Sequence, residues 1–257
     1  MKSTLSLIVS LMAFLALGQN PAVTAAVANQ WQLPLVNPCP DGSPQDYAVS
    51  YDMSRATVSG GFITTLVDGS ANGYNGVSYV GHRAMATNNP AIIRGSRWAD
   101  FPDVSASWYT NLNVVLAQTN TFFLEVCYPT YAAVGYTFDS TNSSYRNALA
   151  LTSPQTLRLT ANSTVTLANP LVAGQWYVVE VCFCGANSFV RTNGVDMQTG
   201  INTGSEGMSG LTIGQNYNHG ASGGGPHLAY FRVYNRGLDP SEEAAVLTYF
   251  QCRFGTQ

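Results

Sequence analysis

The sequence predicts an all-β protein: two antiparallel sheets packed as a sandwich, with one short C-terminal helix. Three observations support this fold class. Glycine, serine, threonine, asparagine and tyrosine dominate the polar residues, a composition typical of strands joined by tight turns. Several segments alternate in side-chain character with a period of two. A well-marked helix start lies near the C-terminus.

The last predicted strand covers Leu228–Asn235 and follows a shorter strand at Leu211–Gly214. Its side chains divide into two faces, with Ala229, Phe231 and Val233 on one and Tyr230, Arg232 and Tyr234 on the other. This alternation is the pattern expected of a strand.

A helix is predicted directly after this strand. Asp239 suits the N-cap, Pro240 the first helical position, and Glu242 the acidic position of a capping box. Leucine and phenylalanine residues then recur at helical spacing, and Gly255 can end the helix.

Two further strands, Phe122–Tyr128 and Trp176–Cys184, alternate clearly. One face of each strand is wholly apolar and is expected in the core. The opposite faces carry Glu125 and Glu180 and are expected on the outside of a sheet, together with the cysteines. The C-terminal helix must lie against one such outer face. Other expected strands lie within Val58–Gly76, Ala91–Phe101, Trp108–Ala117, Leu149–Thr152, Thr156–Ala161 and Thr164–Ala168.

The order of these segments resembles a known family. A strand that ends in a Tyr234-Asn235-Arg236 turn, followed by a helix that finishes Arg253-Phe254-Gly255, resembles the C-terminal signature of laminin-G-like domains. A Trp176 strand followed one strand later by an Asn193-Gly194 turn extends the resemblance over roughly Tyr51–Gly255. These domains belong to the concanavalin A-like superfamily, and the resemblance implies a two-sheet antiparallel jelly roll.

The N-terminal part is expected to lie outside this domain. Residues 1–28 read as a secretory signal peptide, with a positive start, an apolar run over Leu5–Leu17 and a small-residue cleavage site. Residues 29–50 form a proline-rich extended arm, and residues 51–257 form the jelly-roll domain. The mature protein is therefore expected to be secreted.

Charge excludes some partners. Only 10% of the residues are charged, and the single lysine, Lys2, lies in the predicted signal peptide. The arginines are scattered, and the formal net charge is -3. This balance argues against nucleic acid and acidic membrane surfaces as partners, and no membrane span is expected in the mature chain.

Five cysteines remain after cleavage: Cys39, Cys127, Cys182, Cys184 and Cys252. Disulfides are the default in an oxidising compartment, and the odd number leaves one cysteine free or intermolecular. A link from Cys252 to Cys184 or Cys182 suits the helix, and a cross-strand Cys127–Cys182 link suits the strands. Cys39 could hold the arm. The sequence does not fix the connectivity.

Candidate glycan-binding residues lie in the loop after Leu211–Gly214. Sugars bind an aromatic plate that covers the apolar ring face, together with amides that read the hydroxyls. Tyr217 supplies the ring, and Asn216, Asn218 and His219 supply the polar groups. Trp98 and Trp108 are further candidates. The alternative for each residue is an ordinary loop or packing role.

Calcium is common in relatives of laminin-G-like domains. Asp68, Ser70 and Asn72 place oxygens at alternating positions, as a calcium loop does, although no distal bidentate acid follows. The alternative is simple turn chemistry, which the sequence favours. Asn142 and Asn162 begin glycosylation sequons.

The resemblance implies recognition of a glycan or an extracellular glycoprotein without catalysis. Related enzymes such as laminarinases carry Glu-x-Asp-x-(x)-Glu along one strand, and no such run occurs here. One alternative is a structural subunit of an extracellular coat, sheath or filament, because low charge and an unpaired cysteine suit self-assembly. A second alternative is a polysaccharide hydrolase or lyase.

Overall fold

The structure is a computed structural model that describes residues 39–78, 83–88, 97–101, 108–129, 134–152, 155–219 and 225–255. The chain separates into two units, Met1–Pro40 and Asp41–Gln257. The predicted signal peptide and the first part of the predicted arm lie outside the described residues. Every helix and strand below belongs to the second unit.

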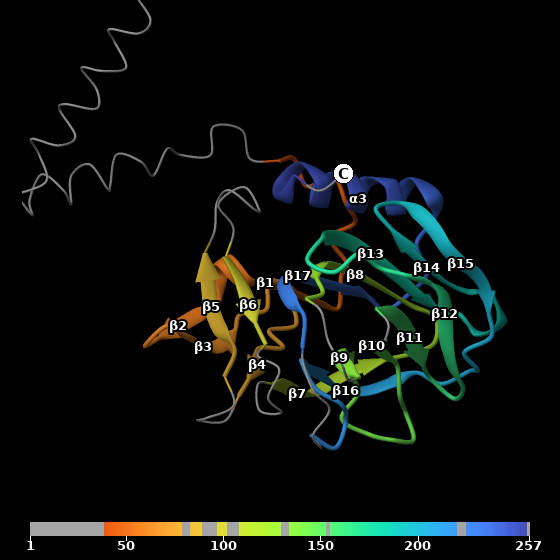
Figure 1. The fold of residues 1–257 in the computed structure, drawn as a ribbon, viewed down its shortest axis with the longest axis horizontal. Helices are drawn as coiled ribbons and strands as arrows, with labels where there is room; N and C mark the ends of the chain where they lie inside the picture. The colour runs from red at the N-terminus through yellow and green to blue at the C-terminus, as the bar shows by residue number, and fades with distance from the viewer. Residues whose placement is uncertain are drawn as a thin grey trace, which may run out of the picture. The chain divides into compact units, whose positions relative to one another are not determined.

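This unit is all-β with one α-helix, as predicted (Figure 1). Its strands, in chain order, are β1 Val49–Asp52, β2 Thr57–Ser59, β3 Phe62–Leu66, β4 Gly76–Val77, β5 Met85–Asn88, β6 Arg97–Asp100, β7 Tyr109–Leu116, β8 Asn120–Cys127, β9 Gly135–Asp139, β10 Ala148–Thr152, β11 Thr156–Thr160, β12 Thr164–Pro170, β13 Trp176–Phe183, β14 Ser188–Thr192, β15 Val195–Ile201, β16 Met208–Ile213 and β17 His227–Tyr234. The helices are the 3-10 turns Met53–Arg55 and Gly185–Asn187 and the α-helix α3 Pro240–Phe254.

Antiparallel pairing arranges most strands in two layers. One layer runs β1–β17–β8–β13–β14–β15, with β6 beside the start of β17. The other runs β4–β7–β16–β9–β10–β11–β12. Strands β2, β3 and β5 link the two layers through β4 and β6, so the pairing is continuous.

The core lies between the two layers. The Phe122 ring of β8 stacks on the Phe138 ring of β9, with ring centroids 4.4 Å apart. The predicted core faces of β8 and β13 are confirmed, because all their apolar members are buried in this cluster: Phe122, Leu124, Val126, Tyr128, Tyr177, Val179, Val181 and Phe183. Each such side chain contributes roughly 1.5–3 kcal/mol when it is fully buried.

Helix α3 begins and ends as predicted. The Asp239 carboxylate accepts hydrogen bonds from the backbone N–H groups of Ser241 and Glu242, and the Glu242 carboxylate accepts one from the backbone N–H of Asp239 at 3.0 Å. Gly255 then adopts the left-handed conformation at φ 76°, which favours glycine and stops the helix.

The helix covers the outer face of β8, β17 and β13. The ring of Phe250 lies 6.1 Å from that of Phe123 on β8 and 5.0 Å from that of Tyr230 on β17. The placement of the helix on an outer face is therefore confirmed. Glu125 and Glu180 lie on this face, but both are buried because the helix covers them.

The polar face of β17 is covered by the segment before β1. Arg232 is buried, and its Nη2 donates to Asp41 Oδ2 at 2.8 Å while its guanidinium lies 4.6 Å from the Tyr47 ring centroid. β1 itself starts at Val49, two residues before the expected domain boundary at Tyr51, because residues 49–52 pair with β17.

The predicted cysteine pairing is wrong. Cys127, Cys182 and Cys184 are free thiols, and the disulfide-bonded cysteines are Cys39 and Cys252. The three free cysteines follow the outer faces of β8 and β13, as their alternation predicts, but no two of them are joined. Burial raises the pKa of Cys127 to about 11, so this thiol stays protonated at neutral pH.

Candidate functional site

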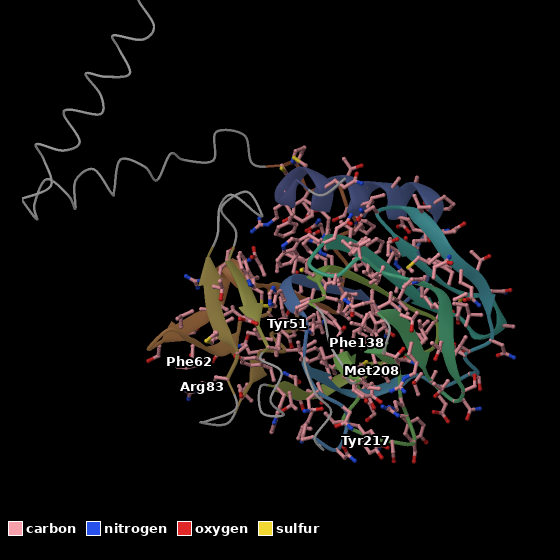
Figure 2. The ribbon with its side chains drawn as sticks, in the orientation of Figure 1. Tyr51, Phe62, Arg83, Phe138, Met208 and Tyr217 are labelled. Atoms are coloured by element: carbon pink, nitrogen blue, oxygen red, sulfur yellow. The ribbon has the colours of Figure 1, made fainter. Side chains whose placement is uncertain are left out.

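The predicted glycan-binding loop follows β16, and Figure 2 shows Tyr217 at the side of the sandwich opposite α3. Two bonds fix this loop to β9. The backbone N–H of Gly214 donates to the Thr137 carbonyl at 2.9 Å, and the backbone N–H of Tyr217 donates to Asp139 Oδ2 at 3.1 Å. Tyr217 itself is half-buried. The loop is therefore held at a defined position beside β9.

Asp139 at the end of β9 organises this region. Its carboxylate is fully buried and accepts two hydrogen bonds from Arg146, Nε to Oδ1 at 2.8 Å and Nη2 to Oδ2 at 2.6 Å. Burial raises the pKa of Asp139, and the bonds from Arg146 act against that rise. Burial alone would lower the pKa of Arg146, but Asp139 raises it above its ordinary value. The two hydrogen bonds of this salt bridge position the Arg146 guanidinium.

Arg146 lies against two tyrosine rings. Its Cζ is 4.9 Å from the Tyr217 ring centroid and 5.5 Å from the Tyr136 ring centroid. Arg158 on β11 contacts the same Tyr136, with Cζ 5.5 Å from the ring centroid and Nη2 donating to the hydroxyl at 2.7 Å. We call Tyr136, Asp139, Arg146, Arg158 and Tyr217 the tyrosine–arginine cluster.

This cluster has a net positive charge of one. Asp139 neutralises Arg146, whereas Arg158 has no ion pair with any acid in the ranges the structure describes. The Nε of Arg158 is buried and has no hydrogen-bond partner there. A half-buried guanidinium without a carboxylate is a binding group for an anion.

The two tryptophans predicted as glycan-binding candidates lie in different surroundings. Trp108 stacks on His219 with ring centroids 3.8 Å apart and an interplanar angle of 6°, so it belongs with the Tyr217 loop. Trp98 is buried on β6, where its ring lies 5.7 Å from that of Trp176 and 6.2 Å from that of His227. Trp98 is therefore buried among aromatic rings and lies apart from the Tyr217 loop in its contacts.

Asp68, Ser70 and Asn72 form a hydrogen-bonded turn. The Asp68 carboxylate accepts from the backbone N–H groups of Ser50, Ser70 and Tyr74 at 2.9, 2.9 and 2.7 Å. The Asn72 amide donates to the Ala48 carbonyl at 3.0 Å. The turn interpretation accounts for these contacts. Within the described residues, no three His, Cys, Asp or Glu side chains are placed to hold a metal ion.

A second polar group lies beneath the first part of α3. Arg191 on β14 is surrounded by three carboxylates, with Nη1 3.3 Å from Glu180 Oε2 and 2.7 Å from Glu243 Oε2, and Nε 2.6 Å from Asp196 Oδ1. These four side chains line a cavity of about 310 Å³ together with Gly194, Pro240, Ala244 and Leu247. Burial raises the pKa of Glu180 to about 8, and the neighbouring Glu243 carboxylate adds to the rise.

Both sequon asparagines, Asn142 and Asn162, lie on exposed turns. In the part of the chain that the structure describes, no helix has the length and apolar character needed to cross a membrane.

Most of the tyrosine–arginine cluster, and the cavity, could not be predicted from the sequence. Arg146 and Arg158 are isolated arginines in the sequence, and Glu243 directly follows the capping-box residue Glu242, so its position is typical of a helix start. The one available signal was the alternation of Tyr136 with Phe138, which marks a short strand next to an Asp-Ser-Thr-Asn turn.

No protein-family model matches the sequence, and no curated protein matches it. Solved structures do match. The sialidase of Trypanosoma rangeli in complex with the inhibitor DANA has a TM-score of 0.55 at 12% identity, covering 88% of this chain and 38% of that one. The binding domain of botulinum neurotoxin DC in complex with SialylT has a TM-score of 0.55 at 13% identity, covering 80% and 51%.

A botulinum neurotoxin serotype D/C binding domain gives a TM-score of 0.56 at 14% identity, covering 80% of this chain and 52% of that one. The chain thus spans between a third and about half of the length of these proteins. At these identities the comparison shows the fold alone. The chain has an all-β sandwich fold, and the narrower resemblance to laminin-G-like domains stays a prediction.

Proposed function

We propose that this chain is a non-catalytic recognition protein that binds a carbohydrate carrying an acidic group at the tyrosine–arginine cluster. One observation carries the proposal: Arg146 lies against the rings of Tyr217 and Tyr136, while Arg158, which contacts the same Tyr136 ring, has no acid partner among the described residues. Tyrosine rings cover the apolar face of a sugar, and a guanidinium binds a carboxylate.

The side chains of the cluster are held in place by hydrogen bonds without a ligand, and this favours binding. Asp139 fixes Arg146 through two hydrogen bonds, and it also fixes the backbone of Tyr217. A site held before the ligand arrives loses less conformational entropy on binding. Asn216 and Asn218 flank Tyr217 in the sequence, and the proposal gives their amides the role of contacting sugar hydroxyls.

The structural neighbours are compatible with this proposal. One of them is a toxin binding domain solved with SialylT, and another is a sialidase solved with sialic acid at a TM-score of 0.50. Sialic acid is an acidic sugar, so the ligand chemistry in these complexes is of the type that Arg158 suits. Each match covers only part of the neighbour, so the neighbours support the fold and leave the ligand to experiment.

The proposal is tested with a glycan array that contains matched acidic and neutral oligosaccharides, probed with calcium and then with a chelator. We expect selective binding to acidic glycans, weakened by Tyr217→Ala and by Arg158→Gln. Val172→Ser, a change at an exposed residue outside the cluster, serves as the control. Binding that disappears with chelator would support a calcium site. A blank array with folded protein would refute the proposal.

Self-assembly is the second candidate, and an exposed apolar surface favours it. Leu112, Val115 and Tyr145 are 74%, 68% and 59% exposed. Val115 and Tyr145 line a hollow of about 230 Å³ that also includes Met208. Contiguous exposed apolar surface marks interaction sites. Light scattering after size exclusion tests this: a mass that falls to the monomer value in Val115→Asp supports assembly, and a monomeric wild-type chain excludes it.

A further inference from the structure

The cavity beneath α3 holds more negative than positive charge. Glu180, Glu243 and Asp196 surround the single guanidinium of Arg191, and these four groups are the charged side chains that line it. With all groups ionised, the cavity carries a net charge of -2. Two other acidic residues on the surrounding elements do not line the cavity: Glu242 is paired with Arg236, and Glu125 is buried on β8.

One oxygen in this cavity lacks a donor. The Glu180 side chain is 7% exposed, and its Oε1 is buried without a hydrogen-bond donor among the described residues. Among the described residues, the Glu180 carboxyl pairs with Arg191 and lies beside the Glu243 carboxylate, which is itself an acceptor. An unpaired buried carboxylate oxygen costs free energy, so the pair needs either a shared proton or an added cation.

A metal ion does not fit here. Metal ions need several oxygens within about 2.6 Å of one point, and no three acids come that close within the described ranges. An ammonium group has different requirements. It has three N–H donors that reach carboxylate oxygens at about 2.8 Å. It can therefore join Glu180 and Glu243 without drawing all three carboxylates together.

We infer that this cavity is a second binding site, which takes a small ligand bearing a primary ammonium group. The ammonium lies between Glu180 and Glu243 and takes the place of the proton that Glu180 holds in the empty site. Asp196, whose side chain is 57% exposed, accepts from a further donor of the ligand at the cavity mouth. Leu247 and Ala244 provide the apolar wall. The cavity volume of about 310 Å³ admits a single hexosamine residue or a short diamine.

The site lies on the opposite side of the sandwich from Tyr217 (Figure 2), so it is separate from the tyrosine–arginine cluster. Leu247 packs closely against the turn between β14 and β15, since a Cβ built on Gly194 would lie 2.5 Å from its Cδ2. The helix and this turn therefore form one wall of the cavity.

Isothermal titration calorimetry tests the inference with three probes: glucosamine, putrescine and N-acetylglucosamine. The acetylated sugar has the same ring as glucosamine but lacks the ammonium group. We expect glucosamine or putrescine to bind at pH 7 and N-acetylglucosamine to bind at least about tenfold more weakly, since a charge-assisted hydrogen bond is worth roughly 1.5–3 kcal/mol. Which amine binds distinguishes an amino sugar from a free diamine as the source of the ammonium.

Glu180→Gln should weaken the binding of the amine by at least about tenfold, and Asp196→Asn should weaken it less. Glu206→Gln, which removes a carboxylate outside the cavity, is the matched control and should bind as the wild type does. Titrations in two buffers of different ionisation enthalpy should show that a proton is released with the wild-type chain and none with Glu180→Gln. Equal binding of the acetylated sugar, binding unchanged in Glu180→Gln, or no binding of either amine would overturn the inference.

Discussion

Replacing Glu180 by glutamine should stabilise the chain, by an amount that grows with pH. Burial beneath α3 raises the pKa of this carboxyl from its ordinary value of 4.5 to about 8. Between these pH values the folded chain holds a proton that the unfolded chain releases. Folding then takes up a proton, so the free energy of unfolding falls as pH rises, by up to about 1.4 kcal/mol per pH unit.

From pH 4.5 to pH 7 this loss amounts to on the order of 3 kcal/mol. It is absent below about pH 4.5, where Glu180 is protonated in both states, and it stops growing above about pH 8. Glutamine has the shape of the protonated acid but no proton to lose. Glu180→Gln should therefore match the wild type near pH 4.5 and exceed it by roughly 2–3 kcal/mol at pH 7.

Urea unfolding at pH 4.5, 5.5, 6.5 and 7.5, monitored by tryptophan fluorescence, measures this difference in unfolding free energy. The slope expected for a single proton is about 1.4 kcal/mol per pH unit. Glu206→Gln is the control and should run parallel to the wild type, because Glu206 does not line the cavity. Parallel curves for Glu180→Gln and the wild type would refute the reasoning, since they would mean that Glu180 folds without its proton.

Three further changes test the packing. Asp139→Asn leaves Arg146 half-buried without its partner and should cost about 3 kcal/mol in urea unfolding. Phe250→Ala removes the ring that packs on β8 and β17 and should cost about 3–5 kcal/mol, by the same assay. Gly210→Ala should cost more than Gly174→Ala, because both have a positive φ but only at Gly210 would the new Cβ lie 1.9 Å from Thr141 Oγ1. Equal costs for the two glycine variants would contradict this steric account.

Local sequence signals predicted the parts of the fold that local interactions determine. The capping box at Asp239 and Glu242 and the stop at Gly255 depend on contacts within a few residues, and all three are present. The core faces of β8 and β13 follow from alternation alone, because the side-chain period of a strand is two. Alternation also placed Glu125 and Glu180 on an outer face correctly.

Contacts between distant segments could not be predicted in this way. Glu180 meets Glu243 only because α3 folds back over β13, and neither position carries a signal for the other. The sequence likewise carried no local signal that Cys39 and Cys252 would be the disulfide-bonded cysteines. The residues next to Tyr217 in the sequence predict it as a glycan-binding candidate. Arg146 and Asp139 lie beside Tyr217 because β16 pairs with β9, and the sequence carries no signal for that pairing.

The central claim, acidic-glycan recognition at the tyrosine–arginine cluster, is tested most directly by one titration. Sialyllactose and lactose, which differ by the acidic sugar, are titrated against the wild type and Arg158→Gln. The account predicts that the wild type prefers sialyllactose by at least about tenfold, as expected for one charge-assisted contact, and that Arg158→Gln removes the preference without changing thermal stability. Equal affinity of the wild type for both sugars, or an unchanged preference in Arg158→Gln, would contradict it.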